Sequence, residues 1–171
     1  MTLPRVGISS CLLGNAVRWD GGHKRDPVVV ELLAPLVEWV PVCPELELGM
    51  GVPREPVHLE RVGEEIALLG NQSRADWTLR MRAFAAPRLR ELAARGLCGF
   101  VLKQSSPSCG LERVELRLAS GEVKREARGV FAAALVERFP GLPIEEEGRL
   151  HDPALRERWL GRVHAYRRGA V

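Results

Sequence analysis

The chain has 171 residues, 46% of them hydrophobic, and a formal net charge of +3 at pH 7. This length fits one domain of ordinary size, and such a domain buries roughly 70% of its unfolded surface, so it needs neither disulfides nor a structural metal to fold. Acidic residues are interleaved with the basic ones, which indicates solvated helix faces with ion pairs and argues against nucleic-acid binding on charge alone.

Neither a membrane anchor nor a secretion signal is visible in the sequence. No apolar stretch reaches the roughly 18 residues that a membrane-spanning helix needs. The first residues, MTLPRVGISSCLLG, lack the charged region, the long apolar region and the cleavage site of a signal peptide. We therefore expect a cytoplasmic protein with reduced thiols, whose four cysteines are metal ligands, nucleophiles or core residues.

Short apolar runs alternate with helical patterns along the chain. An Asp-Pro pair marks the start of two of the helical patterns, as is typical of a capped helix that begins with proline. Pro87 lies inside the longest pattern, and an interior proline costs about 3 kcal/mol, so we expect a kink or a split there. In chain order, the sequence predicts a strand over 5–11, a helix over 27–36, a strand over 37–43, a hairpin over 58–70, a helix over 75–95, a strand over 97–109, a helix over 128–141, a short strand over 143–148 and a closing helix over 152–168.

The alternation of strands and helices predicts an α/β fold with a mainly parallel sheet. We expect a single domain over residues 1–171, folded as a three-layer sandwich with a Rossmann-like sheet. In such sheets, ligands bind beyond the carboxyl ends of the strands. Candidate functional residues should therefore follow the strand ends.

Three of the four cysteines lie at or after predicted strand ends. Cys11 and Cys43 each end an apolar run, and Cys109 follows the third run within the polar stretch QSSPSCG. The topology can therefore bring these three thiols to one edge of the sheet. Cys98 begins an apolar run without polar neighbours, so we interpret it as a core residue.

From the residues alone, two interpretations of the three cysteines stay open. They form a metal or cluster site, or they are separate structural residues. The chain has no C-x-x-C pair, so a zinc ribbon has no local support. Three thiolates without a fourth protein ligand would leave an open coordination position on Zn²⁺ or on a 4Fe–4S cluster, and a substrate can bind there.

Three long motifs, GISSCLLGNAVRWDGGHKRDP, VPVCPELELGMGVPREPVHL and LKQSSPSCGLERV, together resemble the thiouracil desulfidase (TudS) family. The resemblance runs from about residue 4 to the end. It implies a 4Fe–4S cluster held by Cys11, Cys43 and Cys109, with one iron left open. It also implies an acid/base role for Glu45, in the CPE motif, and a catalytic role beside the cluster for Ser106, the first serine of SPSCG.

The activity implied by this resemblance is an iron–sulfur-dependent, non-redox hydrolysis that removes sulfur from a thiolated pyrimidine and releases sulfide. The substrate would be 4-thiouracil, its nucleotide or a thiolated tRNA base. The last third of the chain resembles the YbgA-like branch, in which a second, all-helical domain follows, yet the chain ends at Val171. It is either a one-domain member of that branch or a piece of a longer protein, and a small-molecule substrate is expected without the second domain.

The segment RWDGGHKRDP packs charged residues around two glycines. It is either a solvated turn or a loop that offers charged groups to a phosphate or to the uracil oxygens. Arg54, in GMGVPREP, either pairs with Glu55 or contacts the substrate. Trp19 is the tryptophan best placed to stack on a base, although packing at the rim is the simpler interpretation. The predicted substrate-binding set is Arg18, Asp20, Lys24, Arg54, Ser105 and Ser108.

Two functions compete with the desulfidase hypothesis. One is a cluster-bearing, RNA-associated binding or sensing domain without turnover. The other is a zinc-binding or purely structural α/β domain. Sulfide release from a thiopyrimidine separates the enzyme from the binding domain, and iron analysis tests the structural alternative. Oligomeric state, the ring position of the sulfur and the sulfide acceptor are open.

Overall fold

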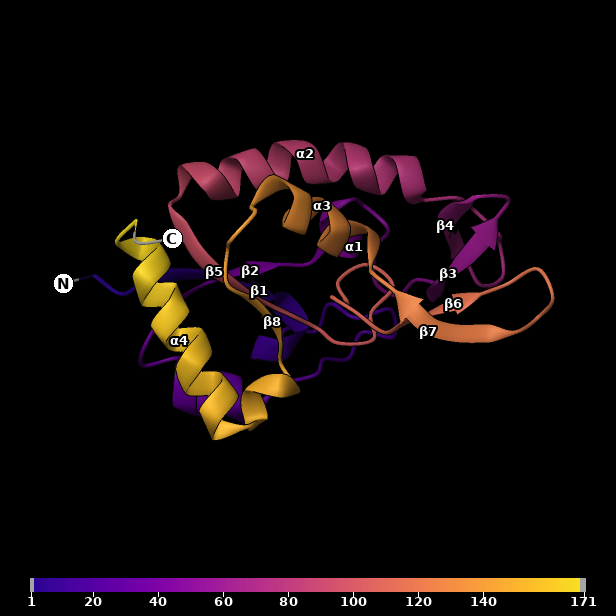
Figure 1. Ribbon diagram of the computed structural model, residues 1–171. Helices are drawn as coiled ribbons and strands as arrows, with labels where there is room; N and C mark the ends of the chain where they lie inside the picture. The colour runs from indigo at the N-terminus through magenta and orange to yellow at the C-terminus, as the bar shows by residue number, and fades with distance from the viewer. Residues whose placement is uncertain (1, 170–171) are drawn as a thin grey trace.

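The computed structural model describes residues 2–169 of the chain. Its centre is a four-stranded, wholly parallel sheet with strand order β2-β1-β5-β8 (Figure 1). Every residue of β5 is buried, as expected for a parallel strand that is covered on both faces. The strands of this sheet are β1 (Arg5–Ser9), β2 (Glu38–Val42), β5 (Leu97–Leu102) and β8 (Ile144–Glu146).

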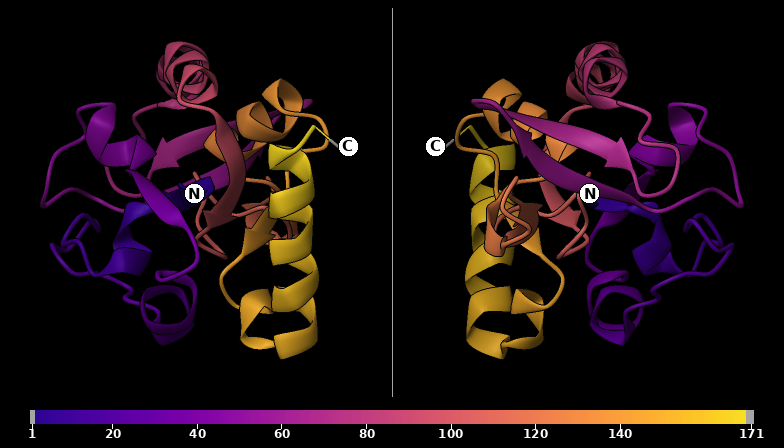
Figure 2. Two further views of the ribbon diagram at one scale, coloured as in Figure 1. Left: turned by 90° about the vertical axis from the view of Figure 1, so that its left-hand side faces the viewer. Right: turned by 90° about the vertical axis from the view of Figure 1, so that its right-hand side faces the viewer.

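Helices cover both faces of the parallel sheet. On one face, α2 (Thr78–Ala94) and α3 (Val130–Arg138) bury Met81, Leu89 and Phe131 in one core cluster with Val40 and Phe100 of the sheet. Figure 2 shows α2 nearly end-on on this side, whereas α4 runs along another flank of the molecule. The helices α2 and α3 form the first of the two helical layers that the predicted sandwich requires.

The opposite face carries α4 (Pro153–Arg167) and a short π-helix (Val28–Leu33). Leu33 of the π-helix and Trp159 of α4 share a second core cluster with Ile8 and Val101 of the sheet. The three-layer α/β sandwich predicted from the sequence is therefore confirmed. The Asp-Pro start of the closing helix is also present, because Asp152 accepts hydrogen bonds from the N–H groups of Ala154 and Leu155.

A second four-stranded sheet, with order β4-β3-β6-β7, extends the molecule beyond the carboxyl ends of the parallel strands (Figure 1). The hairpin predicted over 58–70 is its β3–β4 pair, whereas β6 and β7 were not predicted. Leu59, Leu68 and Leu116 of this sheet belong to the same core cluster as the α2 face. Its strands are β3 (Val57–Val62), β4 (Glu65–Gly70), β6 (Val114–Arg117) and β7 (Val123–Ala127).

The long helix α2 passes through Pro87 as one element, so the predicted split is wrong. Proline removes the hydrogen bond to the carbonyl four residues earlier, which belongs to Ala83. Both residues are exposed, so water can satisfy this carbonyl. Within residues 2–169, every helix is too short or too polar to cross a lipid bilayer.

Candidate active site

A cavity of about 260 Å³ lies at the carboxyl ends of β1, β2 and β5, and three cysteines line it. Cys11 lies in the 3-10 turn Ser10–Leu13 that follows β1. Cys43 directly follows β2 and precedes the short helix α1 (Pro44–Glu47). Cys109 lies in the loop after β5. Parallel strands end at a common edge, which is why residues far apart in sequence meet here.

All four thiols are free, and burial raises the pKa of each of them. The pKa of Cys11 rises to about 11, and repulsion from Cys43 adds to the effect of burial. Cys109 is affected in the same way by burial and by both other cavity thiols. Cys98 does not line the cavity, and its thiol donates to the carbonyl of Gly96 at 3.3 Å. The three cavity thiols are therefore neutral at pH 7 unless a metal displaces their protons.

This pKa predicts slow alkylation of Cys11 in metal-free protein. A pKa of about 11 in place of 9.0 lowers the thiolate fraction at pH 8 by ~100-fold. Peptide mass mapping after iodoacetamide pulses should show a rate that rises about tenfold per pH unit from pH 8 to 10. A rate that levels off above pH 9, as for a small free thiol, would contradict the shift and would indicate steric protection alone.

The loop that carries Cys109 is held by its own serine and by a helix end. The hydroxyl oxygen of Ser106 accepts hydrogen bonds from the N–H groups of Ser108, at 3.2 Å, and Cys109, at 3.0 Å. The carbonyl of Ser108 accepts from the N–H groups of Phe131 and Ala132, in the first turn of α3. These helix N–H groups have no partner within the helix. Their hydrogen bonds to the loop therefore fix the loop against α3 and orient Cys109.

Gly129, just before α3, permits this close approach. A Cβ at this position would lie 2.5 Å from the backbone carbonyl of Ser108. Gly129→Ala should therefore lower the free energy of unfolding by about 1–3 kcal/mol, as overpacking does. Urea titration measures this effect.

Gly161 provides the matched control for that substitution. It lies inside α4, where a Cβ would meet no atom within 4 Å. Gly161→Ala should stabilise the helix by about 0.5–1 kcal/mol. If Gly129→Ala were as stable as the wild type, the close packing of loop and helix would not matter for the fold.

Glu45, in α1, is held in the cavity wall by two partners. Its Oε1 lies 3.3 Å from Nε of Arg54, and its Oε2 accepts from the hydroxyl of Ser108 at 3.2 Å. Arg54 is itself 6% exposed and donates to the carbonyls of Gly51, at 2.8 Å, and Val17, at 2.9 Å. The carboxylate therefore has a fixed orientation, and the Glu45 side chain is 16% exposed.

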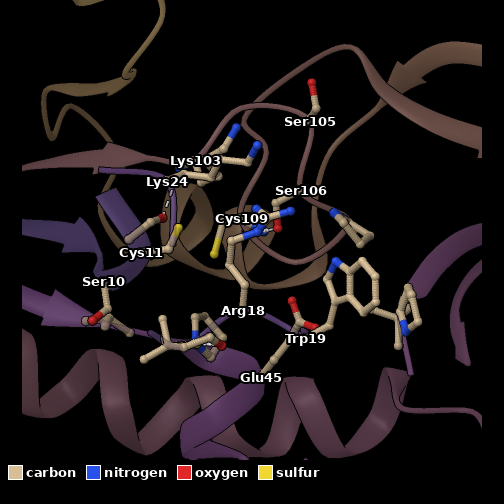
Figure 3. Close-up of a pocket in the computed structure, with 18 of the residues that line it drawn as sticks. Ser10, Cys11, Arg18, Trp19, Lys24, Glu45, Lys103, Ser105, Ser106 and Cys109 are labelled. Atoms are coloured by element: carbon tan, nitrogen blue, oxygen red, sulfur yellow. Dashed lines mark hydrogen bonds between the residues drawn. The ribbon is translucent and has the colours of Figure 1, made fainter. Parts of the chain in front are cut away.

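The remaining predicted substrate-binding residues divide into two groups. Arg18, Lys24 and Ser105 line the cavity, as Arg54 does. In Figure 3, Arg18 is drawn between the thiols of Cys11 and Cys109 and the carboxylate of Glu45.

Asp20 and Ser108 are not among the residues that line the cavity. Asp20 accepts the N–H of Gly22 at 2.9 Å and so shapes its own loop. Ser108 is fully buried behind the wall, where it contacts Glu45. Ser108 therefore supports Glu45, which does face the cavity, whereas Asp20 contacts a residue outside the lining.

A sequence model of the 2-thiouracil desulfurase family matches residues 6–147. The chain belongs to this family. It is 31% identical over 150 residues to the uncharacterised protein YbbK of Bacillus subtilis (strain 168), an alignment that covers 85% of this chain and 97% of YbbK. It is also similar to the solved structure of the 4Fe–4S-dependent thiouracil desulfidase TudS, with a TM-score of 0.71 and 29% identity over 91% of this chain and 98% of TudS. The family resemblance inferred from the motifs is confirmed.

The part of the chain that matches the desulfurase family includes all the residues that line the cavity. Within residues 2–169, no three His, Cys, Asp or Glu side chains converge on the position of a single metal ion. A cluster makes a different demand, because each thiolate binds its own iron. Three soft thiols spread around one cavity, with no fourth cysteine in its lining, fit a cluster that leaves one iron without a protein ligand.

Several cavity residues were not predicted from the sequence, and Lys103 and Ser9 are two of them. Lys103 directly follows β5, and Ser9 ends β1. The hydroxyl oxygen of Ser9 accepts the N–H of Lys103 at 2.9 Å and so joins the two strand ends. Both residues obey the rule that selected the cysteines, since each lies at the carboxyl end of a parallel strand.

Proposed function

We propose that the chain is an iron–sulfur-dependent desulfidase that removes sulfur from a thiolated pyrimidine by non-redox hydrolysis and releases sulfide. The observation that carries the proposal is the meeting of Cys11, Cys43 and Cys109 in one cavity, with Glu45 in the same wall. Membership of the 2-thiouracil desulfurase family supports it. So does the similarity to TudS, a 4Fe–4S-dependent thiouracil desulfidase.

In this proposal, Cys11, Cys43 and Cys109 hold a 4Fe–4S cluster. The bound cluster supplies a soft Lewis acid for the substrate's sulfur at the iron that has no protein ligand. The protein contributes the shape of the cavity, which presents the ring carbon to water and to Glu45.

Glu45 is the proposed acid/base. It takes a proton from the water that adds to the ring carbon, a step for which a positioned carboxylate typically contributes 10²–10⁴-fold. Arg54 and Ser108 keep one carboxylate oxygen each in place, so the carboxylate does not have to reorient during the reaction. The oxygen of Ser106 accepts two backbone N–H groups, which leaves its own proton free to donate to the base or the water.

The cavity suits a small substrate. Its volume of about 260 Å³ lies just below the usual range for small-ligand pockets. Arg18 and Lys24 in the lining supply positive charge for a phosphate, and Trp19, which is 41% exposed, offers a surface on which a base can stack. We therefore propose 4-thiouracil or its nucleotide as substrate, with a thiolated tRNA base as the larger alternative.

The test is anaerobic reconstitution followed by a panel of 2-thiouracil, 4-thiouracil and the 4-thio nucleotide. We expect loss of the thione absorbance together with stoichiometric sulfide for at least one of them. A protein with a full cluster that turns over no thiopyrimidine would favour the alternative, a cluster-bearing RNA-associated binding or sensing domain.

A further inference from the structure

Lys103 is fixed in the cavity wall by a buried carboxylate from the end of a neighbouring strand, β8. Its Nζ lies 3.0 Å from Oε1 of Glu147, and the two side chains are 16% and 8% exposed. The other oxygen of Glu147 accepts the N–H of Gln104 at 2.8 Å. Glu147 directly follows β8, so it ties the start of the loop that carries Cys109 to the neighbouring strand.

The hydrogen-bond inventory of Lys103 leaves one donor for a ligand. An ammonium has three N–H donors and no acceptor. One of them faces Glu147, and another goes to the carbonyl of Gln104 at 2.7 Å. Contacts within residues 2–169 therefore use two of the three, while the side chain still lines the cavity.

Lys103 acts on the side of the cavity where the thiols lie. Lys103 follows β5 and Cys11 follows β1, the strand paired with β5, and both residues line the cavity. In Figure 3, Lys24 and Lys103 lie on the same side of the cavity as Cys11. The ligand atom within reach of Lys103 is thus the one that binds next to the thiols.

Lysine is also a rare residue in this chain. The 25 basic residues include only three lysines, Lys24, Lys103 and Lys124, and two of these three line this cavity. An ammonium is a compact point charge with rotatable donors, whereas a guanidinium is a larger planar fork. The lysines of this chain are therefore concentrated at this cavity.

We propose that Lys103 is a further catalytic residue, which donates a hydrogen bond to the substrate's sulfur and stabilises the negative charge that develops there. The inference rests on the proposed desulfidase function.

In the proposed reaction, water loses a proton to Glu45 and forms a C–O bond at the ring carbon. The C–S bond then breaks, its electron pair stays on sulfur, and hydrosulfide leaves with the proton from Glu45. The remaining hydroxyl proton is released as the carbonyl forms, and Lys103 keeps its own protons throughout.

The test compares Lys103→Met and the double variant Lys103→Met/Glu147→Gln with wild type, all loaded with cluster. The double variant removes the unpaired carboxylate that Lys103→Met leaves buried, so it separates catalysis from folding. We expect kcat to fall by about 100-fold in both variants, the low end for loss of one charge-stabilising donor. KM, iron content and inhibition by the product uracil should stay within about twofold, because the carbonyl oxygen that replaces the sulfur in uracil carries no developing negative charge. Lys124→Met, on the exposed strand β7, is the control and should match wild type.

A double variant with wild-type kcat would overturn the inference and would make Lys103 a structural residue. An equal loss of uracil binding and turnover would also overturn it, because Lys103 would then bind the ring rather than the sulfur. A fully loaded wild type that desulfidates nothing would overturn the proposed function itself, which distinguishes the two failures.

Discussion

Cys109→Ala should abolish desulfidation and leave the protein without its full complement of iron. Cys109 is 7% exposed, lines the cavity and lies in a loop that Ser106 and α3 hold in place. In the proposed cluster, removal of one of three thiolates would leave a second iron without a protein ligand, and we expect such a cluster to be lost. Iron and acid-labile sulfide analysis after anaerobic reconstitution, with thione absorbance as the assay, measures both losses.

Cys98→Ala is the matched control for this prediction. Cys98 is 6% exposed, so the same substitution removes the same atom from a similarly buried position, but outside the cavity lining. It should retain wild-type iron content and activity. Equal losses in both variants would show that buried thiols matter only for packing, and retention of full activity by Cys109→Ala would remove this residue from the site.

Glu45→Gln should lower kcat by about 10²–10⁴-fold without loss of the cluster. Glutamine has the shape of glutamate, but it cannot take a proton from water. The amide oxygen can still accept from Arg54 or Ser108, so the local packing should survive. Single-turnover decay of the thione absorbance gives the rate, and the visible spectrum reports the cluster.

Glu64→Gln, in the exposed turn between β3 and β4, serves as the control for Glu45→Gln and should be fully active. If Glu45→Gln retained more than about a tenth of the wild-type rate with a full cluster, Glu45 would not be the acid/base. Loss of iron in the same variant would instead assign the carboxylate a role in cluster retention.

The position of the three cysteines could be predicted because it depends on strong local signals. Buried parallel strands appear as apolar runs, each run is followed by a turn, and parallel strands end at one edge. Cys11, Cys43 and Cys109 follow three such runs. The core strand β5, which is buried throughout, is the clearest example.

The second sheet could not be predicted in the same way. In β6 the buried residues are Val114 and Leu116, and four of the five residues of β7 are exposed. Such short strands are determined by pairing with a neighbour rather than by their own apolar content. The unbroken α2 was missed for a related reason, since the cost of Pro87 depends on whether the carbonyl of Ala83 faces water.

Within the site, the contacts between distant residues were invisible in the sequence. The SPSCG motif identified Ser106, but the bond from Ser108 to Glu45 spans 63 positions along the chain. Lys103 and Glu147 are likewise paired through the adjacent strands β5 and β8. Residue types and spacing locate a loop, whereas the role of each side chain depends on the partners that the fold brings to it.

The most direct test of the account is the iron and acid-labile sulfide content per chain of anaerobically reconstituted protein. A 4Fe–4S cluster that Cys11, Cys43 and Cys109 hold jointly predicts about four irons and four sulfides per chain. Each of the three single alanine variants should fall well below that value. Zinc or no metal in the wild type, or an unchanged cluster in any of the three variants, would contradict the claim that these thiolates jointly hold an iron–sulfur cluster.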